Sequence, residues 1–226
     1  ELNELKSRFV STASHEFRTP LATILSSASI ILKYNKEEEQ VNREKHIGKI
    51  KNAVNHLTGL LNDFLSLSKL EEGRVNIMIE PMYLSELLQE IAEDLSGIKK
   101  PGQEICFDGQ NQIELHTDRN ILKNILFNII SNAIKYSEED IHIVVEEKQS
   151  EVSIAVKDRG IGIPGDDQKH LFTRFFRATN VGNIQGTGLG LNIVKRYCEL
   201  LSASIDISSE FGVGTTVEIT IPKHTN

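Results

Sequence analysis

Residues 46–64 read HIGKIKNAVNHLTGLLNDF, and apolar side chains recur in this stretch at alternating intervals of three and four residues. Such spacing places the apolar side chains on one stripe of an α-helix, which is the pattern of a coiled-coil seam. It predicts a helix over residues 42–70, followed by Gly73 as the C-terminal cap. The predicted seam consists of Ile47, Ile50, Val54, Leu57, Leu61 and Phe64.

A second amphipathic helix is predicted upstream, over residues 1–34, and the polar segment Tyr34–Gln40 separates it from the first. Two helices joined by a short loop form an antiparallel hairpin. A lone hairpin exposes its apolar stripe, so we expect two chains to combine in a four-helix bundle. Packing of the hairpin against its own C-terminal domain is the alternative.

The run HEFRTPL, residues 15–21, places a histidine beside a carboxylate in the middle of the upstream helix. A neutral imidazole offers one ring nitrogen as a nucleophile, and Glu16 could hold the proton on the other. Pro20 lacks a backbone donor and is predicted to kink the helix. A surface His–Glu pair with a tolerated proline is the alternative. A zincin helix does not fit, because the residue four positions after His15 is Thr19 rather than histidine.

Composition narrows the function classes. The 226 residues suffice for one large domain or two modest ones, and the net charge of −7 argues against nucleic acid or an anionic membrane as the main partner. Cys106 and Cys198 are too few for a disulfide framework, so we expect buried thiols in a reducing compartment. No apolar run approaches the roughly 18 residues that cross a bilayer, and no signal peptide opens the chain. Because Glu1 lies inside a helical pattern, we expect an excised piece of a longer protein.

Beyond Gly73 strands and helices are grouped without regular βαβ alternation, which predicts an α+β two-layer sandwich. One mixed sheet is expected, with helices covering a single face. The predicted helices are 84–95, capped by Ser85, then 118–136, capped by Asp118, and 189–201. The predicted strands are 75–79, 105–107, 113–116, 141–147, 152–158, 205–208 and 215–221. A loop as long as 159–187 inside a compact domain is usually functional.

Asparagines recur at four-residue intervals on the predicted helix 118–136. Asn124, Asn128 and Asn132 share one face, with Lys135 and Tyr136 one turn further on. A line of asparagines is poor for helix stability, since each side chain competes for backbone hydrogen bonds. Their carbonyl oxygens suit Mg²⁺, which keeps several waters and bridges phosphates. Lys135 would supply a point charge to the same phosphates.

A first glycine box, DRGIGIP at residues 158–164, follows directly from a predicted strand. The oxygens of Asp158 could accept from the exocyclic amine of adenine, and the glycines let a ring approach the backbone. The spacing Gly160-x-Gly162-x-x-Gly165 also matches the dinucleotide fingerprint formally. That assignment needs a helix opening at the glycines within a βαβ unit, and Pro164 with the polar loop beyond argues against it.

A second glycine box, GTGLGL at residues 186–191, opens the last predicted helix. Converging N–H groups and the positive end of the helix dipole suit phosphate there. A flexible hinge is the alternative. Between the two boxes, LFTRFFR at residues 171–177 places three phenylalanines in the loop. They favour a docking surface or core packing equally, and Arg174 and Arg177 could reach phosphate.

Together these runs resemble the catalytic core of bacterial sensor histidine kinases. The H box (HEFRTPL), N box (NILFNIISNAIKYS), first glycine box, F box (LFTRFF) and second glycine box occur in the family's order across residues 1–221. The resemblance implies that residues 1–72 form a dimerisation and histidine phosphotransfer hairpin. It implies that residues 73–226 form an ATP-binding domain of the Bergerat (GHKL) type.

The resemblance also implies roles for the hairpin residues. His15 would be the phosphoacceptor, and Glu16 its general base or orienting partner. The spacing Glu16-x-x-Thr19 matches the motif by which many such kinases dephosphorylate their partner, with Thr19 orienting a water.

In the second domain, the resemblance implies that Asn128 and Asn132 hold Mg²⁺ and that Lys135 contacts phosphate beside Tyr136 at the nucleoside. Asp158 would read adenine beneath a lid of roughly residues 165–187. The other implied nucleotide contacts are Gly160, Gly162, Arg177, Gly186, Thr187, Gly188, Leu189, Gly190 and Thr216, the last lining the adenine pocket.

The implied activity is ATP-dependent autophosphorylation of His15 with Mg²⁺, followed by relay to an aspartate on the receiver domain of a response regulator. The implied partner in assembly is a second copy of the chain, with no nucleic acid and no direct membrane contact, in the cytoplasm. Any membrane tether would lie upstream. A fragment that mainly removes phosphate from its partner is an alternative. A non-catalytic ATP-gated scaffold is disfavoured, because neither His15 nor Asn132 is missing. Whether a chain phosphorylates itself or its dimer mate depends on the hairpin loop near 35–41.

Overall fold

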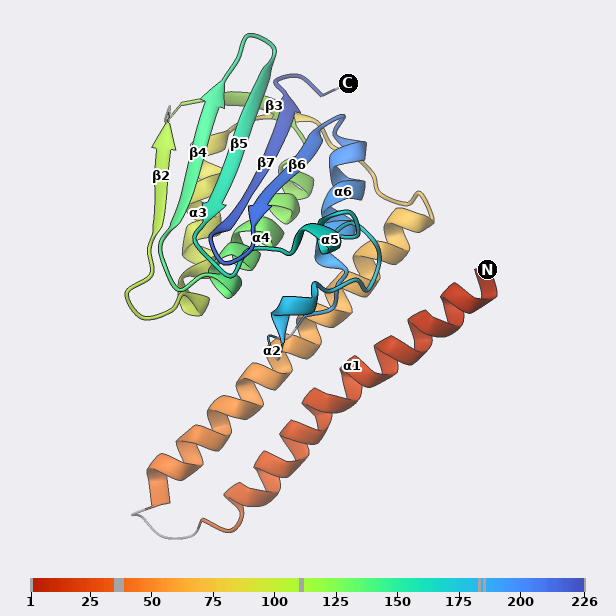
Figure 1. Ribbon diagram of the computed structural model, residues 1–226, viewed down its shortest axis with the longest axis vertical. Coiled ribbons are helices and arrows are strands. Elements are labelled where there is room, and N and C mark those ends of the chain that lie inside the picture. The colour runs from red at the N-terminus through yellow and green to blue at the C-terminus, as the bar shows by residue number, and fades with distance from the viewer. Residues whose placement is uncertain (1, 35–38, 110–111, 183, 185, 226) are drawn as a thin grey trace. The chain divides into compact units, whose positions relative to one another are not determined.

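The structure, a computed structural model, describes residues 2–34, 39–109, 112–182, 184 and 186–225, with the backbone alone for residues 2–15 (Figure 1). The chain divides into two compact units, Glu1–Glu72 and Gly73–Asn226. They are called the N-terminal and C-terminal units below.

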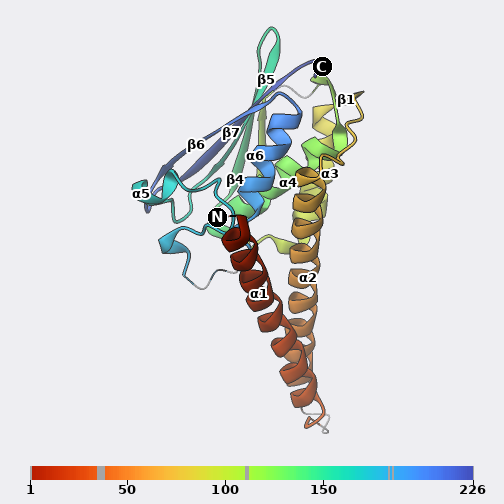
Figure 2. The ribbon, with the colours of Figure 1, turned by 90° about the vertical axis from the view of Figure 1, so that its right-hand side faces the viewer.

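The N-terminal unit consists of two helices, α1 (Leu2–Ile31) and α2 (Gln40–Glu71), which pack side by side as the predicted hairpin (Figures 1 and 2). The rings of Phe17 and Phe64 stack across the pair at 5.7 Å. Pro20 is buried, and α1 continues helical through it. The predicted polar break between the helices falls largely on residues 35–38, which lie outside the described residues.

The apolar stripe of α2 divides into two rows with different surroundings. Ala53, Leu60 and Leu67, spaced seven residues apart, are buried within the hairpin. The seam residues Ile47, Val54 and Leu61 also lie seven apart, but their exposed fractions are 43%, 46% and 51%. Further exposed apolar side chains of this unit are Leu21, Leu25, Leu32, Val41 and Leu65. The hairpin therefore covers one apolar row and leaves the other uncovered in a single chain.

The C-terminal unit is the predicted two-layer sandwich. Its five-stranded sheet has the order β2-β4-β5-β7-β6, with β2 parallel to β4 and the other neighbours antiparallel. Helices α3, α4 and α6 cover one face of this sheet (Figures 1 and 2). The helices are α3 (Leu84–Leu95), α4 (Arg119–Tyr136), α5 (Gly165–Gln168) and α6 (Gly190–Leu200). The sheet strands are β2 (Ile105–Gly109), β4 (Ile141–Glu147), β5 (Glu151–Asp158), β6 (Ser204–Glu210) and β7 (Gly214–Pro222).

The hydrophobic core lies between that sheet and the three helices. Along β4 the buried residues Ile141, Ile143 and Val145 alternate with more exposed ones, so that one row faces the helices. Helix α4 is central, and its apolar side is buried throughout, from Ile121 to Ile134. This packing fixes which side of α4 can bear polar residues.

Two predictions at the start of this unit are wrong. Residues 75–79 are not a strand. Instead β1 (Glu80–Tyr83) pairs with β3 (Glu114–Thr117) in a separate two-stranded sheet. The Met78 N–H donates to the Asp118 carboxylate at 2.7 Å rather than to a ladder.

The second wrong prediction is the cap of α3. The N-cap residue is Tyr83, which makes no side-chain cap, and Ser85 lies one residue inside the helix. The preceding strand continues directly into the helix, and the Leu84 N–H bonds the Ile113 carbonyl at 2.9 Å. A capping side chain before Leu84 is therefore replaced by a tertiary contact.

The long predicted loop 159–187 contains two short ordered pieces, α5 and a 3-10 turn at Thr179–Val181. Residues 183 and 185 of this loop lie outside the described residues. Strand β5 is antiparallel to both of its neighbours and leads into no long helix, which excludes the Rossmann alternative. Among the helices that the structure describes, none combines the length and apolar character needed to cross a bilayer.

Candidate functional site

The asparagines of α4 lie on the side of the helix away from its buried apolar row. Asp118 caps the helix as predicted, its Oδ1 accepting from the Ile121 N–H at 2.9 Å. The Asn124 amide donates to the Asn120 carbonyl at 2.8 Å, and the Asn128 amide donates to the Asn124 carbonyl at 3.0 Å. Because each NH₂ group bonds the turn behind it, the side-chain oxygen of each residue is left as the acceptor.

At the last turn of α4, Lys135 and Tyr136 lie together. The Lys135 ammonium stands 4.8 Å from the centre of the Tyr136 ring. Burial raises the pKa of the Tyr136 hydroxyl, opposed by the positive charge of Arg177. Arg177 also donates to the Ile184 carbonyl. The lysine, the tyrosine and the arginine thus form one positively charged corner of the C-terminal unit.

The first glycine box is attached to the end of α4. Asp158 Oδ1 accepts from the Gly160 N–H at 2.8 Å, and the Ile161 N–H donates to the Tyr136 carbonyl at 3.2 Å. A Cβ on Gly160 would lie 2.3 Å from that carbonyl oxygen, so only glycine fits. Burial raises the pKa of the Asp158 carboxyl, partly offset by the backbone N–H groups of Gly160 and Thr215. The box therefore holds a half-buried carboxylate beside Tyr136.

The second glycine box passes directly over the polar side of α4. A Cβ on Gly186 would lie 2.8 Å from the Lys135 ammonium, and one on Gly190 would lie 2.9 Å from Asn128 Oδ1. Gly190 also begins α6, and that helix packs against α4. Two segments more than fifty residues apart in sequence are thereby brought together.

The middle residues of the second glycine box, Thr187, Gly188 and Leu189, hold it in place. Gly188 has a φ of +68°, and its carbonyl accepts from the Phe175 N–H at 2.9 Å. Thr187 Oγ1 accepts from the Leu189 N–H at 3.0 Å, and the Leu189 side chain is buried. The box is therefore bound to the F box on one side and anchored in the core on the other.

The threonine that faces Asp158 across the ladder is Thr215 rather than the predicted adenine-pocket residue Thr216. In the β5–β7 ladder Asp158 faces Thr215, whereas Thr216 faces Lys157. Directly paired residues project from the same side of a sheet, so Thr216 lies on the opposite face from Asp158. The sequence held a signal for this choice. Thr215 lies an even number of residues from the buried Ile219 and Ile221, so alternation along a strand places all three side chains on the same face.

Sequence reasoning also missed the polar anchors of the predicted lid. The buried carboxylate of Asp167 accepts from both the N–H and the hydroxyl of Thr179 at 2.8 Å, which lowers its pKa. The Asn180 amide donates to the Gly162 carbonyl at 2.8 Å. The predicted lid is thus hydrogen-bonded to the first glycine box through Asn180. The F-box rings of Phe172, Phe175 and Phe176 are half-buried, between the two predicted alternatives.

His15 lies on α1, in the N-terminal unit, and so does the rest of the H box. Glu16 is half-buried and Thr19 is exposed. The four-residue spacing puts His15 and Thr19 on neighbouring turns of the same helix side.

The residues present fit a magnesium ion that is held largely by phosphates and water. Over the described residues, no group of three or more His, Cys, Asp or Glu side chains could hold a metal. Asn128 and Asn132 carry side-chain amide oxygens, which are hard ligands that suit a Mg²⁺ ion retaining several waters and phosphate oxygens. The orientation of the Asn128 amide, with its oxygen toward Gly190, agrees with that role.

Comparisons with known proteins identify the class. The C-terminal unit combines a mixed sheet, helices on one face, and two glycine boxes against an asparagine-bearing helix. Residues 117–225 of this unit match the "Histidine kinase-, DNA gyrase B-, and HSP90-like ATPase" family. Residues 5–73 match the "His Kinase A (phospho-acceptor) domain" family. The chain therefore belongs to the histidine kinases, as the catalytic core of a sensor kinase.

Similar curated proteins carry histidine kinase names. The chain is 34% identical over 231 residues to hybrid signal transduction histidine kinase B of Dictyostelium discoideum, covering 97% of this chain and 12% of that protein. It is 32% identical to the autoinducer 2 sensor kinase/phosphatase LuxQ of Vibrio parahaemolyticus, covering 97% of this chain and 27% of that protein. The chain thus spans about a quarter or less of the length of these relatives.

Solved structures share the fold. Acinetobacter baumannii histidine kinase AdeS matches with a TM-score of 0.71 and 22% identity, over 92% of this chain and 98% of that one. Full-length ShkA in complex with AMPPNP matches with a TM-score of 0.66 and 27% identity, over 97% of this chain and 46% of that one. ThkA in complex with the response regulator protein TrrA matches with a TM-score of 0.69 and 22% identity, over 99% and 62%.

Proposed function

We propose that residues 73–226 bind Mg²⁺-ATP and that its terminal phosphoryl group passes to His15 on the hairpin of residues 1–72. The observation that carries this proposal is the close approach of Gly186 and Gly190 to Lys135 and Asn128. The glycine backbone, a lysine and an amide oxygen are thus close together, and each of these groups suits the phosphates of Mg²⁺-ATP. The AMPPNP named with ShkA supports the same nucleotide class.

In this proposal the adenine amine donates to Asp158, beside Thr215 and against the backbone of the first glycine box. Lys135 and the N–H groups of the second glycine box hold the phosphates. Asn128 and Asn132 would hold Mg²⁺, which supplies charge neutralisation when bound. Phosphoryl transfer mostly needs such positioning and charge stabilisation.

The chemical step forms one bond and breaks one. A ring nitrogen of His15 attacks the γ-phosphorus, the bond to the bridging oxygen breaks, and ADP leaves with the electron pair. The product is a phosphoramidate, and the proton on the ring is held by Glu16 or lost to water. A receiver-domain aspartate then takes the phosphoryl group from the imidazole.

Partners follow from the same proposal. The exposed row Ile47, Val54 and Leu61 favours a second copy of this chain, since two hairpins would bury both rows in a four-helix bundle. The response regulator named with ThkA and the kinase/phosphatase name of LuxQ support a receiver domain as the phosphoryl acceptor.

The deciding experiment is His15→Gln with ATP labelled on the γ-phosphate. We expect complete loss of acid-labile label from the chain, while Mg²⁺-ATP affinity stays at the wild-type value. His56→Gln, on α2, is the matched control and should keep its label. Acid-labile label that persists in His15→Gln would reject His15 as the acceptor.

A phosphatase activity on the receiver domain rests on Thr19, the exposed residue one turn beyond His15. We expect Thr19→Ala to slow removal of phosphate from a phosphorylated receiver by about 100-fold, the lower end of the range that one positioned proton-transfer group contributes. Autophosphorylation should be unchanged. Thr23→Ala is the control, because Thr23 lies one turn further from His15 and its hydroxyl donates to the backbone carbonyl of Thr19 at 3.1 Å, leaving the Thr19 side chain in place. Equal dephosphorylation by both variants would remove Thr19 from this role.

A further inference from the structure

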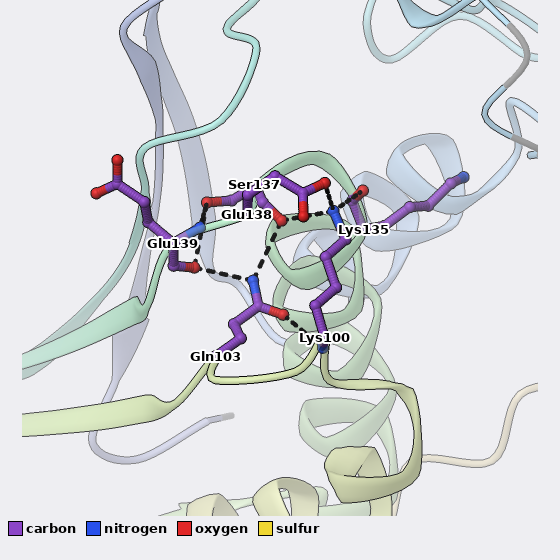
Figure 3. Close-up of polar contacts among 6 residues, drawn as sticks. All are labelled: Lys100, Gln103, Lys135, Ser137, Glu138 and Glu139. Carbon is purple, nitrogen blue, oxygen red and sulfur yellow. Dashed lines mark hydrogen bonds and ion pairs between the residues drawn. The ribbon is translucent and has the colours of Figure 1, made fainter.

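The carboxyl end of α4 is bound by side chains from the connection between α3 and β2 (Figure 3). The Lys100 ammonium donates to the carbonyls of Lys135 at 3.3 Å and Ser137 at 2.7 Å. It also pairs with the Glu138 carboxylate at 2.6 Å. A helix ends in carbonyls without intrahelical partners and in partial negative charge, so a cation there is favourable.

Gln103 completes this arrangement from inside the protein. Its side chain is only 2% exposed, and its NH₂ group donates to the Ser137 carbonyl at 3.2 Å and the Glu139 carbonyl at 2.9 Å. Its side-chain oxygen accepts from the Lys100 N–H at 3.1 Å. Both donors and the oxygen of the buried amide are therefore bonded, and an apolar replacement would leave two carbonyls without this donor.

Between these contacts lies the carbonyl of Tyr136, which accepts from Ile161 in the first glycine box. Three consecutive carbonyls, those of Lys135, Tyr136 and Ser137, are thus bonded from the α3–β2 connection and from the glycine box. Figure 3 shows the Lys135 side chain extending away from the Lys100 ammonium while its carbonyl faces it. Fixing the backbone of this turn therefore fixes the direction in which the Lys135 and Tyr136 side chains leave it.

We propose that Lys100 and Gln103 are positioning residues of the nucleotide site, acting through the backbone of Lys135–Ser137. This inference rests on the proposed function, since it assumes that Lys135 and Tyr136 face the nucleotide. The two residues do not touch the ligand. They hold the last turn of α4 against the first glycine box, so that the phosphate-side lysine and the nucleoside-side tyrosine keep one geometry.

The test compares Lys100→Met and Gln103→Leu with the wild-type chain. We expect each variant to weaken Mg²⁺-ATP binding by about tenfold, equivalent to ~1.4 kcal/mol, and to raise the ATP KM of autophosphorylation similarly. Phosphoryl transfer from an already phosphorylated His15 to a receiver should be unchanged, because that step does not use the ATP site. Lys100→Arg keeps a cation with several donors and should restore most of the affinity.

Lys99→Met is the matched control. The neighbouring ammonium of Lys99 pairs with Glu104 at 2.6 Å, so its loss should leave ATP affinity unchanged. A lowered melting temperature with wild-type affinity in Lys100→Met and Gln103→Leu would assign a purely structural role and overturn the inference. If Gln103→Leu does not fold, Lys100→Met decides the question. Failure of the wild-type chain to bind Mg²⁺-ATP would instead refute the proposed function.

Discussion

The two units of this chain have similar apolar patterns on their helices, but these side chains are partly exposed in the hairpin and buried in the sandwich. In the N-terminal hairpin Leu25 is 71% exposed and Leu61 is 51% exposed. In the C-terminal unit the helix residues Leu122 and Leu126 are both 0% exposed, although they too repeat at helical spacing. The sheet supplies a second apolar surface for α4, whereas within the N-terminal unit the two hairpin helices pack against each other.

This difference shows that an apolar stripe specifies a contact without specifying its partner. The C-terminal unit closes its core within one chain, as a two-layer architecture allows. The hairpin buries the row of Ala53, Leu60 and Leu67 and leaves the adjacent row of Ile47, Val54 and Leu61 exposed. Stability of the hairpin should therefore depend on protein concentration, and stability of the sandwich should not.

The largest expected effect is on association of the hairpin, and it tests whether the exposed apolar row needs a second chain. Leu61→Glu should weaken the proposed dimer more than about 100-fold, since each dimer would bury two carboxylates, and an uncompensated buried charge costs ~3–5 kcal/mol. Mg²⁺-ATP binding should remain unchanged. Sedimentation equilibrium measures the association. Asn62→Glu adds the same charge at the next exposed position and is the control. Wild-type association of Leu61→Glu would contradict a dimer face here.

An intermediate effect is expected on the free energy of unfolding, where one leucine from each unit can be compared. Leu122→Ala should lower the free energy of unfolding of the C-terminal unit by ~2–5 kcal/mol at any protein concentration, because it leaves a cavity in a closed core. Leu25→Ala should alter only unfolding of the hairpin, and its cost should shrink on dilution. Chemical denaturation at two protein concentrations measures both. A dilution-independent cost for Leu25→Ala would show that this leucine needs no second chain.

The smallest expected effect lies within the sandwich. Asp158→Asn should weaken Mg²⁺-ATP binding by about 10- to 100-fold, since a hydrogen bond to a charged group contributes ~1.5–3 kcal/mol. Calorimetric titration measures this change. Asp206→Asn, on the exposed side of β6, is the control and should bind as the wild type does.

Asp158→Asn should weaken nucleotide binding without lowering the thermal stability of the C-terminal unit. Burial raises the pKa of Asp158 in the folded state, so its contribution to stability is full in acid and is lost as pH rises through that pKa. An uncharged asparagine lacks this cost. The variant should therefore melt no lower than the wild type at neutral pH, and any advantage should vanish in acid. A marked loss of stability at neutral pH would contradict this account.

Much of the fold could be predicted because its signals are local. The apolar period identified α1 and α2, and Asp118 marked the start of α4 because a carboxylate can bond the N–H groups of the first turn. The wrong predictions were decided by distant partners. Residues 75–79 alternate like a strand, but β3 pairs with Glu80–Tyr83 instead. Ser85 has the chemistry of a cap but lies inside a helix that begins directly after β1.

By itself, the sequence determined the long helices and most strands, the two glycine boxes and the class of protein, since these depend on spacing along the chain. Only the tertiary structure placed Thr215 rather than Thr216 beside Asp158, because strand register decides which residues share a face. It alone brought Gly186 and Gly190 to α4. It also bound Lys100 and Gln103 to the end of that helix. Such contacts join residues thirty or more positions apart, and topology rather than local propensity sets them.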